Sequence, residues 1–382
     1  MITKFKLVSE NIAVGQKLPW PVYDYDGQQL LGQGEVLKNQ KQLNHMIFLG
    51  AWYQAESSQT SYIASPQIGA SSTMSSFEVV CNLMSKINRC FNLVQSAESD
   101  ESFVHRLMNV VLDVQLACNN SHSAIIGSAQ LITDAPRHLS HALQAAVIAE
   151  VAGQHMNLSL TERFSLVAAA ITQNIGMIAT TNTLFAQRES PSDVQQQAIN
   201  NHPALSAAIL ESLGVTDTRW LNAVRQHHER VDGSGYPSAL VGQTITVEAR
   251  ILGIIDEYIA ISSHRSYRPP LVKGAALKYL CDERGRSIDT EMTELFLKVM
   301  GVFIPGSVVR LCSGELAIVL GHTTTVDNIL VGMLTDTENN PHPKPIPNIE
   351  VSTEAVSKAV SPLDYRQIID QAGDLWPRMR IL

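Results

Sequence analysis

The middle of this chain carries the periodicity of long α-helices. Between Phe77 and about residue 300, apolar side chains recur three and four residues apart, which is the spacing of one helix face. The sequence Ser159-Leu160-Thr161-Glu162 is a capping box and predicts the start of one of these helices. Because such helices must bury their apolar faces against one another, the sequence predicts an all-helical bundle for this region.

Strand patterns flank the helical region on both sides. Before residue 60, the Asp26-Gly27 dipeptide separates two apolar runs and predicts a hairpin turn. After Gly301, short apolar runs return around turn residues, and the four prolines between Asn339 and Asn348 predict an extended connector. The serine-rich stretch before Phe77 is typical of a linker.

We therefore expect a multi-domain, mainly α-helical protein. Its parts are a small β-rich regulatory module (1–60), a linker (61–76), a helical connector (77–135), a helical domain (136–302), a short β appendage (303–350) and a C-terminal tail with a short helix (351–382). Of the 382 residues, 45% are hydrophobic and 17% charged, so the chain can bury substantial cores and is not typical of a disordered protein.

Charge and cysteine usage exclude several classes of function. The formal net charge is −8 and basic residues are scattered, which argues against nucleic-acid binding. Five cysteines without a CxxC spacing predict reduced thiols rather than a disulfide or zinc framework. The sequence has neither a signal-peptide pattern nor an uninterrupted apolar run of about 18 residues, so we expect a cytoplasmic protein with no membrane span.

One short segment combines adjacent imidazoles, a carboxylate and a glycine-rich turn. It reads His227-His228-Glu229-Arg230-Val231-Asp232-Gly233-Ser234-Gly235-Tyr236-Pro237. This segment resembles the signature of the HD-GYP family, a branch of the HD metal-dependent phosphohydrolases that cleaves the bacterial messenger cyclic di-GMP. The resemblance covers residues 136 to 302, under half of the chain, and implies that this helical domain is an HD-GYP domain.

The resemblance implies roles for individual residues. Family members hold one or two metals with histidines and aspartates from separate helices, and a carboxylate bridges the two ions. The matching metal ligands here are His141, His202, His227, His228 and Asp256. The positions that match nucleotide contacts are Tyr236, Arg265 and Arg268. The remaining residues of the signature are Glu229, Asp232, Gly233, Gly235 and Pro237.

The central His-Asp pair of the family is replaced in this chain. Gln173 and Asn174 stand at these two positions, and Met177 stands where the family usually has a lysine. A neutral amide cannot supply the bridging charge, and a glutamine binds transition metals poorly compared with a histidine. The residues that can still hold one metal are His202, His227 and His228. The expected cofactor is therefore one divalent ion, iron or manganese, or none.

Three functions are compatible with this pattern. The interpretation we favour is a degenerate, non-catalytic HD-GYP protein of bacterial cyclic di-GMP signalling, which binds the nucleotide or docks a signalling protein. The first alternative is an active metal-dependent phosphodiesterase that releases pGpG or GMP. The second is a scaffold that binds neither metal nor nucleotide, in which His141 is a core histidine and His202-Pro203 merely begins a helix.

Overall fold

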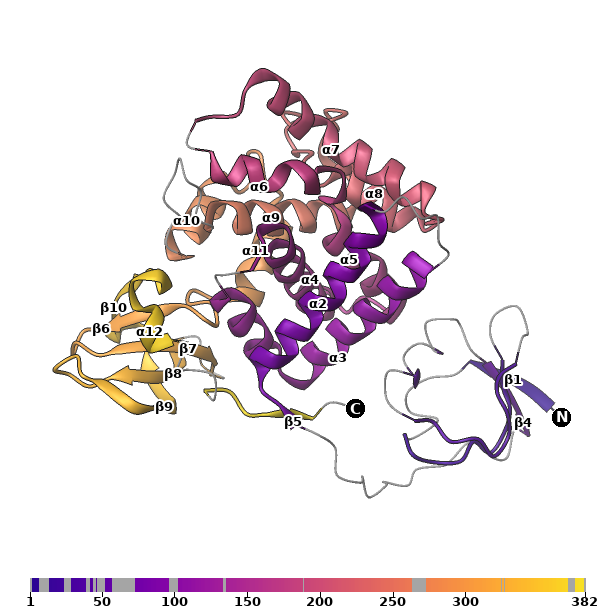
Figure 1. Cartoon of the computed structure of the whole chain (residues 1–382), viewed down its shortest axis with the longest axis horizontal. Coiled ribbons are helices and arrows are strands. Elements are labelled where there is room, and N and C mark those ends of the chain that lie inside the picture. The colour runs from indigo at the N-terminus through magenta and orange to yellow at the C-terminus, as the bar shows by residue number, and fades with distance from the viewer. Residues whose placement is uncertain are drawn as a thin grey trace. The chain divides into compact units, whose positions relative to one another are not determined.

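The computed structural model describes residues 2–6, 14–23, 29–38, 42–43, 46, 52–56, 73–95, 102–132, 135–187, 189–262, 273–323, 325, 327–369 and 375–380. These residues fall into two compact units, residues 1–74 with 379–382 and residues 75–378 (Figure 1). Each unit has an apolar core of its own.

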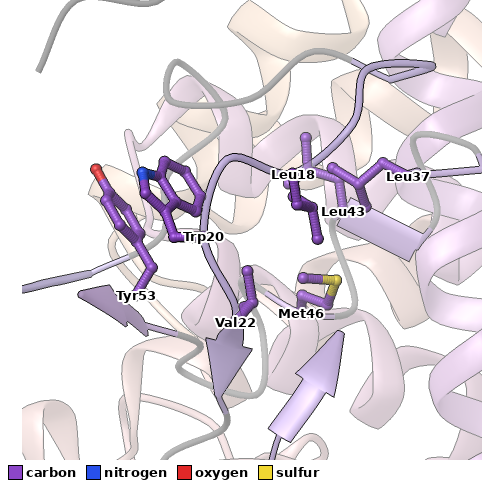
Figure 2. Packing of buried hydrophobic residues seen from close by; sticks show 7 residues of the cluster. All are labelled: Leu18, Trp20, Val22, Leu37, Leu43, Met46 and Tyr53. Carbon is purple, nitrogen blue, oxygen red and sulfur yellow. The ribbon is translucent and has the colours of Figure 1, made fainter. Parts of the chain in front are cut away.

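The smaller unit is a β-rich module, as the strand patterns predicted. Its antiparallel sheet has the order β1-β4-β2-β3, with β1 (Ile2–Lys6), β2 (Val22–Tyr23), β3 (Gln29–Leu31) and β4 (Trp52–Glu56). The pairing of β2 with β3 forms the predicted hairpin, although the Asp26-Gly27 turn itself lies outside the described residues. Figure 2 shows the core of this module, in which Trp20 and Tyr53 stack with ring centroids 3.6 Å apart.

The predicted linker, residues 61–76, lies mostly outside the described residues. Its last residues form the short strand β5 (Thr73–Met74) and the first residue of the next helix, Ser76. Strand β5 pairs antiparallel with β11 (Met379–Arg380), so a segment near the end of the chain lies beside the residues that precede the helical region.

The larger unit contains the predicted helical bundle. Its helices are α2 (Ser76–Gln95), α3 (Ser102–Leu131), α4 (Arg137–His155), α5 (Leu160–Thr172), α6 (Ile178–Ala186), α7 (Asp193–Ser212), α8 (Thr218–Gln226), α9 (Val247–Ser262), α10 (Lys273–Glu283) and α11 (Thr290–Met300). Helix α5 begins at the predicted capping box, because Ser159 accepts the backbone N–H of Glu162 and the Glu162 carboxylate accepts that of Ser159.

Helix α4 lies at the centre of the bundle. It packs against α2, α3, α5, α6, α9 and α11, and its residues from Ala145 to Gly153 are buried without interruption. Helix α5 is similarly enclosed, and the apolar stretch Leu160–Thr181 has the length and composition of a membrane span. Because 72% of the most apolar window in this stretch is buried within the bundle, its hydrophobicity is that of a core helix.

A five-stranded antiparallel sheet follows the bundle. Its order is β10-β6-β7-β8-β9, with β6 (Val308–Leu311), β7 (Leu316–His322), β8 (Asn328–Thr335), β9 (Pro341–Ser352) and β10 (Val356–Val360). The prediction of an extended connector over Asn339–Asn348 was wrong, because most of these residues belong to β9. This strand forms an edge of the sheet, where prolines are tolerated since it has a partner on only one side.

The sheet also continues past the predicted boundary at residue 350. Strand β10 pairs with β6, and the predicted short C-terminal helix corresponds to α12 (Arg366–Ile369). Near the C-terminus, the Trp376 indole Nε1–H donates to the Leu320 carbonyl at 3.0 Å. The same ring lies against Gly127 of α3, where a Cβ atom would come within 2.4 Å of it. Trp376 therefore attaches the sheet to the bundle through a contact that requires a glycine.

Candidate functional site

Five segments of the bundle bring the predicted site residues together. His141 lies on α4, Gln173 and Asn174 follow α5, His202 lies on α7, the adjacent pair His227 and His228 follows α8, and Asp256 lies on α9. The structure places these residues in the wall of one cavity, except His227, which adjoins the lining residue His228.

Two glycines let the segments approach closely enough. A Cβ atom at Gly176 would lie 2.9 Å from the backbone nitrogen of Ser206, and a Cβ at Gly253 would lie 2.9 Å from the carbonyl oxygen of His227. Both distances are shorter than real Cβ contacts, so a larger residue would push α7 away from Asn174, or α9 away from His227.

Three histidines form one part of the site, which we call the histidine half: His202, His227 and His228. One ring nitrogen from each can be chosen so that all three lie within 4.8 Å of one another. The Nδ1–H groups of His202 and His227 donate to the carbonyls of Ile199 and Val224, at 2.6 and 2.7 Å. Their Nε2 atoms consequently face each other, 3.2 Å apart.

This arrangement fits one metal ion. Since each Nδ1 carries a hydrogen, each Nε2 presents a lone pair, and two facing lone pairs require a cation between or beside them. Two nitrogen ligands about 2.1 Å from one zinc ion lie roughly 3.4 Å apart at the tetrahedral angle, close to the 3.2 Å found here. His202, His227 and His228 would hold such an ion.

Burial keeps the histidine half uncharged. It lowers the pKa of His202 to about 3, with help from the neighbouring His227. Burial also lowers the pKa of His227, and burial together with His227 lowers the pKa of His228. Neutral imidazole is the form that binds metals, so these shifts favour ligation at neutral pH.

The other part of the site, which we call the amide half, consists of His141, Gln173, Asn174 and Asp256. His141 Nε2 lies 3.0 Å from Asp256 Oδ1. The Gln173 side-chain nitrogen lies 3.3 Å from His141 Nε2 and 3.4 Å from Asp256 Oδ1, and that of Asn174 lies 3.3 and 3.5 Å from the same atoms. Because His141 Nε2–H donates to Asp256 Oδ1, the amide N–H groups of Gln173 and Asn174 have that same carboxylate oxygen as their acceptor, an atom that would otherwise ligate a metal.

The amide half does not fit a second metal. An amide NH2 group has no lone pair for a cation, and here two such groups meet at one histidine nitrogen and one carboxylate oxygen. Gln173 is 1% exposed, and its Oε1 has no hydrogen-bond partner among the described residues. Burial raises the pKa of Asp256, but the hydrogen bond and charge of His141 outweigh it and hold that pKa well below its usual range.

The glycine-rich loop is held by Glu229 and carries Tyr236 to the site. The buried Glu229 carboxylate accepts the backbone N–H groups of Ser238 and Leu240, at 2.7 and 2.9 Å. A Cβ at Gly235 would lie 2.3 Å from the backbone nitrogen of Arg230, so only glycine fits there. The Tyr236 ring stacks on His228, with centroids 4.7 Å apart and an angle of 21°. The loop is therefore in contact with the histidine half through the stacking of Tyr236 on His228.

The other signature residues shape the loop rather than face a ligand. Asp232 Oδ1 accepts the backbone N–H of Ser234 at 2.9 Å, which is an Asx turn. Gly233 has φ +83°, a conformation that favours glycine. Pro237 follows a cis peptide bond and is exposed.

A cavity of about 470 Å³ opens beside both halves. Its walls include His141, His202, His228, Tyr236 and Asp256. They also include residues that the sequence did not single out, namely Phe91, Arg137, Arg230 and Glu257. The spacing of Arg137 and His141, four residues apart on one helix, is a signal that could have found the arginine. Arg265 and Arg268, predicted to contact phosphate, lie outside the described residues.

Comparison with known proteins identifies relatives for the central part of the chain. A family model for the HD domain matches residues 128–292. The chain is 26% identical over 219 residues to the cyclic di-GMP phosphodiesterase response regulator RpfG of Xanthomonas campestris, covering 55% of this chain and 57% of the relative. It is 29% identical over 152 residues to a cyclic di-GMP phosphodiesterase of Pseudomonas aeruginosa, covering 40% of this chain and 36% of the relative.

The matched region spans between about a third and three fifths of the length of these relatives. Among solved structures, an HDG“Y”P protein of Bdellovibrio bacteriovorus has the same fold, with a TM-score of 0.50 at 12% identity over 78% of this chain and 99% of that one. The family model, these relatives and the signature at residues 227–237 agree that residues 128–292 are an HD domain, similar to the domains of cyclic di-GMP phosphodiesterases of the HD-GYP type.

Proposed function

We propose that this protein is a cyclic di-GMP receptor that does not hydrolyse the nucleotide. The observation that carries the proposal is the pair of amides at Gln173 and Asn174, whose N–H groups surround His141 Nε2 and Asp256 Oδ1. Two-metal hydrolysis of a phosphodiester depends on an anionic bridge between the ions. In this chain that position holds a neutral donor, and the amide half forms a hydrogen-bonded network instead.

The cavity and the relatives support nucleotide binding. A volume of about 470 Å³ is within the range of about 300–1,000 Å³ that small-molecule sites occupy. Tyr236 and His228 offer stacked aromatic faces at its edge, and relatives that match this domain are named for their action on cyclic di-GMP. Cyclic di-GMP is therefore the ligand we assign to the cavity, and a signalling protein would respond to the bound form.

The histidine half supports a second candidate, an active phosphodiesterase with one metal. Three convergent imidazoles favour iron over manganese, because imidazole ligands suit iron and carboxylates suit manganese. A metal there would supply Lewis-acid activation of a phosphoryl oxygen or a water. In that case His227→Ala and His228→Ala would each abolish turnover. We place this candidate second because Asn174 cannot supply the charge that a second ion needs.

Equilibrium dialysis against cyclic di-GMP in the presence of ferrous iron or manganese tests the proposal. Nucleotides in both compartments are then separated by chromatography. Intact cyclic di-GMP enriched on the protein side is the expected result. The appearance of pGpG or GMP would favour the phosphodiesterase, provided that His227→Ala and His228→Ala both stop it. Equal concentrations without product would leave only a scaffold that binds neither metal nor nucleotide.

A further inference from the structure

An ion pair forms part of the cavity wall beside the glycine-rich loop. Arg230 of that loop and Glu257 of α9 both line the cavity, and the guanidinium lies 2.6 Å from the carboxylate. The two side chains are 25% and 21% exposed, so a ligand in the cavity can reach both. A guanidinium has several N–H donors and a carboxylate has several acceptor positions. Their mutual contact therefore leaves hydrogen-bonding groups on each side chain for a ligand.

Tyr279 of α10 contacts the same carboxylate. Burial raises the pKa of Tyr279, and the charge of Glu257 and a hydrogen bond with it raise that pKa further. The phenol is therefore protonated at neutral pH and donates to the carboxylate. Because Tyr279 and Arg230 both hold it, the Glu257 side chain has a fixed orientation, which selective recognition of a ligand requires.

A carboxylate is an unfavourable neighbour for the ligand that we assign to this cavity. Cyclic di-GMP carries two phosphodiester anions, and Glu257 would repel them unless it also met hydrogen-bond donors of the nucleotide. The ribose hydroxyls offer single donors. The guanine base offers two adjacent donors, N1–H and the 2-amino group, which match the two oxygens of one carboxylate. Guanine is therefore the part of the ligand that suits Glu257.

The order of groups in the ion pair also matches the Watson–Crick edge of guanine. That edge presents the 2-amino group, N1–H and O6 in sequence, which is donor, donor, acceptor. The Glu257 carboxylate followed by the Arg230 guanidinium presents acceptor, acceptor, donor. Adenine has an acceptor at N1 and a donor at its 6-amino group, so it would place a lone pair against the carboxylate. The ion pair is therefore complementary to guanine and not to adenine.

Tyr236 supplies an aromatic ring on which the base can stack. The ring lines the cavity, is partly exposed, and belongs to the same loop as Arg230. Burial raises the pKa of Tyr236, and the charges of Asp256, Arg230 and Glu257 also act on it, so the ion pair lies close to this ring. Stacking on an aromatic side chain combined with hydrogen bonds to the base edge is how proteins read a single base.

We propose that Glu257 and Arg230 read the Watson–Crick edge of one guanine of cyclic di-GMP, with the base stacked on Tyr236. The Glu257 carboxylate accepts hydrogen bonds from N1–H and the 2-amino group, and the Arg230 guanidinium donates one to O6. This inference rests on the proposed function and deepens it, because it names the residues that select the base. The cavity then prefers a guanine nucleotide to the corresponding adenine nucleotide.

Isothermal titration of the full chain with cyclic di-GMP, cyclic di-AMP and cyclic di-IMP tests the proposal. The wild type should bind cyclic di-GMP at least about tenfold more tightly than cyclic di-AMP, which is the discrimination that a matched pair of hydrogen bonds to a base supplies. Cyclic di-IMP lacks only the 2-amino groups of cyclic di-GMP. It should bind about tenfold more weakly than cyclic di-GMP, because the carboxylate then loses one donor.

The variant Glu257→Gln should shift the preference from guanine towards adenine. Its amide offers one acceptor and one donor, which match the 6-amino group and N1 of adenine. Affinity for cyclic di-GMP should fall about tenfold and affinity for cyclic di-AMP should rise. The matched control is Glu211→Gln, which neutralises a glutamate paired with Arg225 outside the cavity and should keep the preference of the wild type.

A milder variant serves if Glu257→Gln does not fold, as judged by its thermal midpoint. Tyr279→Phe removes only the phenol hydroxyl that holds the Glu257 carboxylate. It should weaken the binding of cyclic di-GMP and leave that of cyclic di-AMP unchanged, so the preference for guanine narrows. A preference identical to that of the wild type would contradict the role of the carboxylate.

Each remaining outcome overturns a distinct claim. Equal affinity of the wild type for cyclic di-GMP and cyclic di-AMP would overturn base reading and leave the receptor proposal standing. A rise in affinity for both nucleotides in Glu257→Gln would show that the carboxylate only repels phosphate, and an equal fall for both would show that the ion pair only holds the loop. Wild-type protein that does not bind cyclic di-GMP would overturn the receptor proposal and this inference together.

Discussion

The histidine half and the amide half lie side by side, but the polar atoms of the two halves are paired in different ways. In the histidine half, two Nε2 lone pairs face each other at 3.2 Å, and the rings are locked by their bonds to backbone carbonyls. In the amide half, His141 and Asp256 are surrounded by N–H donors from Gln173 and Asn174. The first arrangement fits a cation, whereas the second is held by hydrogen bonds and by the charged contact between His141 and Asp256.

The difference between the two halves shows how two substitutions can change the chemistry of one half of a two-metal site and leave the other half unchanged. Gln173 and Asn174 are close in shape to the residues of an ordinary metal site, so the five segments still converge. Their chemistry differs, because an amide offers a hydrogen where a carboxylate offers charge. Under the proposed function, the shape of the site is kept while one half no longer binds a metal, which is the arrangement a receptor of the same nucleotide would need.

The largest expected effect concerns metal affinity. His227→Ala removes one of three ligands, and we expect affinity for ferrous iron or zinc to fall by at least about 100-fold. His141→Ala is the matched change in the amide half and should alter that affinity by less than about threefold. Competition with a chromophoric chelator measures both. Equal losses in the two variants would show that the metal is shared between the halves.

A smaller effect follows from the pH dependence of stability. The pKa of His202 is about 3 in the folded protein, against about 6.5 in an unfolded chain. Below pH 6.5 the unfolded chain therefore binds a proton that the folded protein does not, so the free energy of unfolding falls as the pH is lowered. For His202 alone the loss between pH 7 and pH 5 is about 2 kcal/mol.

The amide half follows the same sign in a different pH window. The pKa of Asp256 is held below its usual value, so its stabilising effect is present above about pH 4 and is lost only below it. Urea unfolding of chelator-treated protein at pH 7 and pH 5 therefore isolates the histidine half. The variant His202→Gln should lose clearly less stability over this range than the wild type, and an identical loss would contradict the assignment.

Asn174→Asp should give a smaller change that depends on metal. The Asn174 amide nitrogen lies 3.5 Å from Asp256 Oδ1, and a carboxylate there would repel Asp256 without a cation. We expect the metal-free variant to lose about 1–2 kcal/mol of stability and to gain a larger rise in thermal midpoint on adding manganese than the wild type does. The exposed change Asn200→Asp adds the same charge as a control. A metal response no larger than that of the wild type would mean that more than one residue blocks the second ion.

The smallest effect is expected for Gln173→Met. This change removes the hydrogen bond to Asp256 and the contact with His141, but it also removes a buried Oε1 that has no partner in the described structure. The two contributions oppose each other, so the free energy of unfolding should change by less than about 1 kcal/mol. Chemical denaturation measures it. A loss of several kcal/mol would show that the amide network is a major source of stability.

Local patterns in the sequence predicted much of this fold. Helical periodicity and the capping box at Ser159 identified the bundle, and two apolar runs around Asp26-Gly27 identified the β2–β3 hairpin. The four prolines after Asn339 were misread, because their place on an edge strand depends on pairing between β8 and β9. The end of the sheet was missed for the same reason, since β10 pairs with the distant strand β6.

For the site, too, the identity of the residues could be predicted from the sequence, whereas their contacts could not. The resemblance to the HD-GYP family named the residues of both halves, and it placed the two amides at the family's His-Asp pair. That both amides meet at His141 Nε2 and Asp256 Oδ1 could not be predicted, because it depends on how α4, α5 and α9 pack. The cavity-lining position of Arg137 also depends on that packing. Arg265 and Arg268 stay predictions.

The number of metal ions per chain tests the division of the site most directly. Purified protein is saturated with ferrous iron under anaerobic conditions, freed of excess metal by gel filtration, and analysed for metal and protein content. One ion per chain, lost in His227→Ala and retained in His141→Ala, is the result expected from a histidine half that binds and an amide half that does not. Two ions per chain would contradict this account, because the amide half would then ligate a metal despite Gln173 and Asn174.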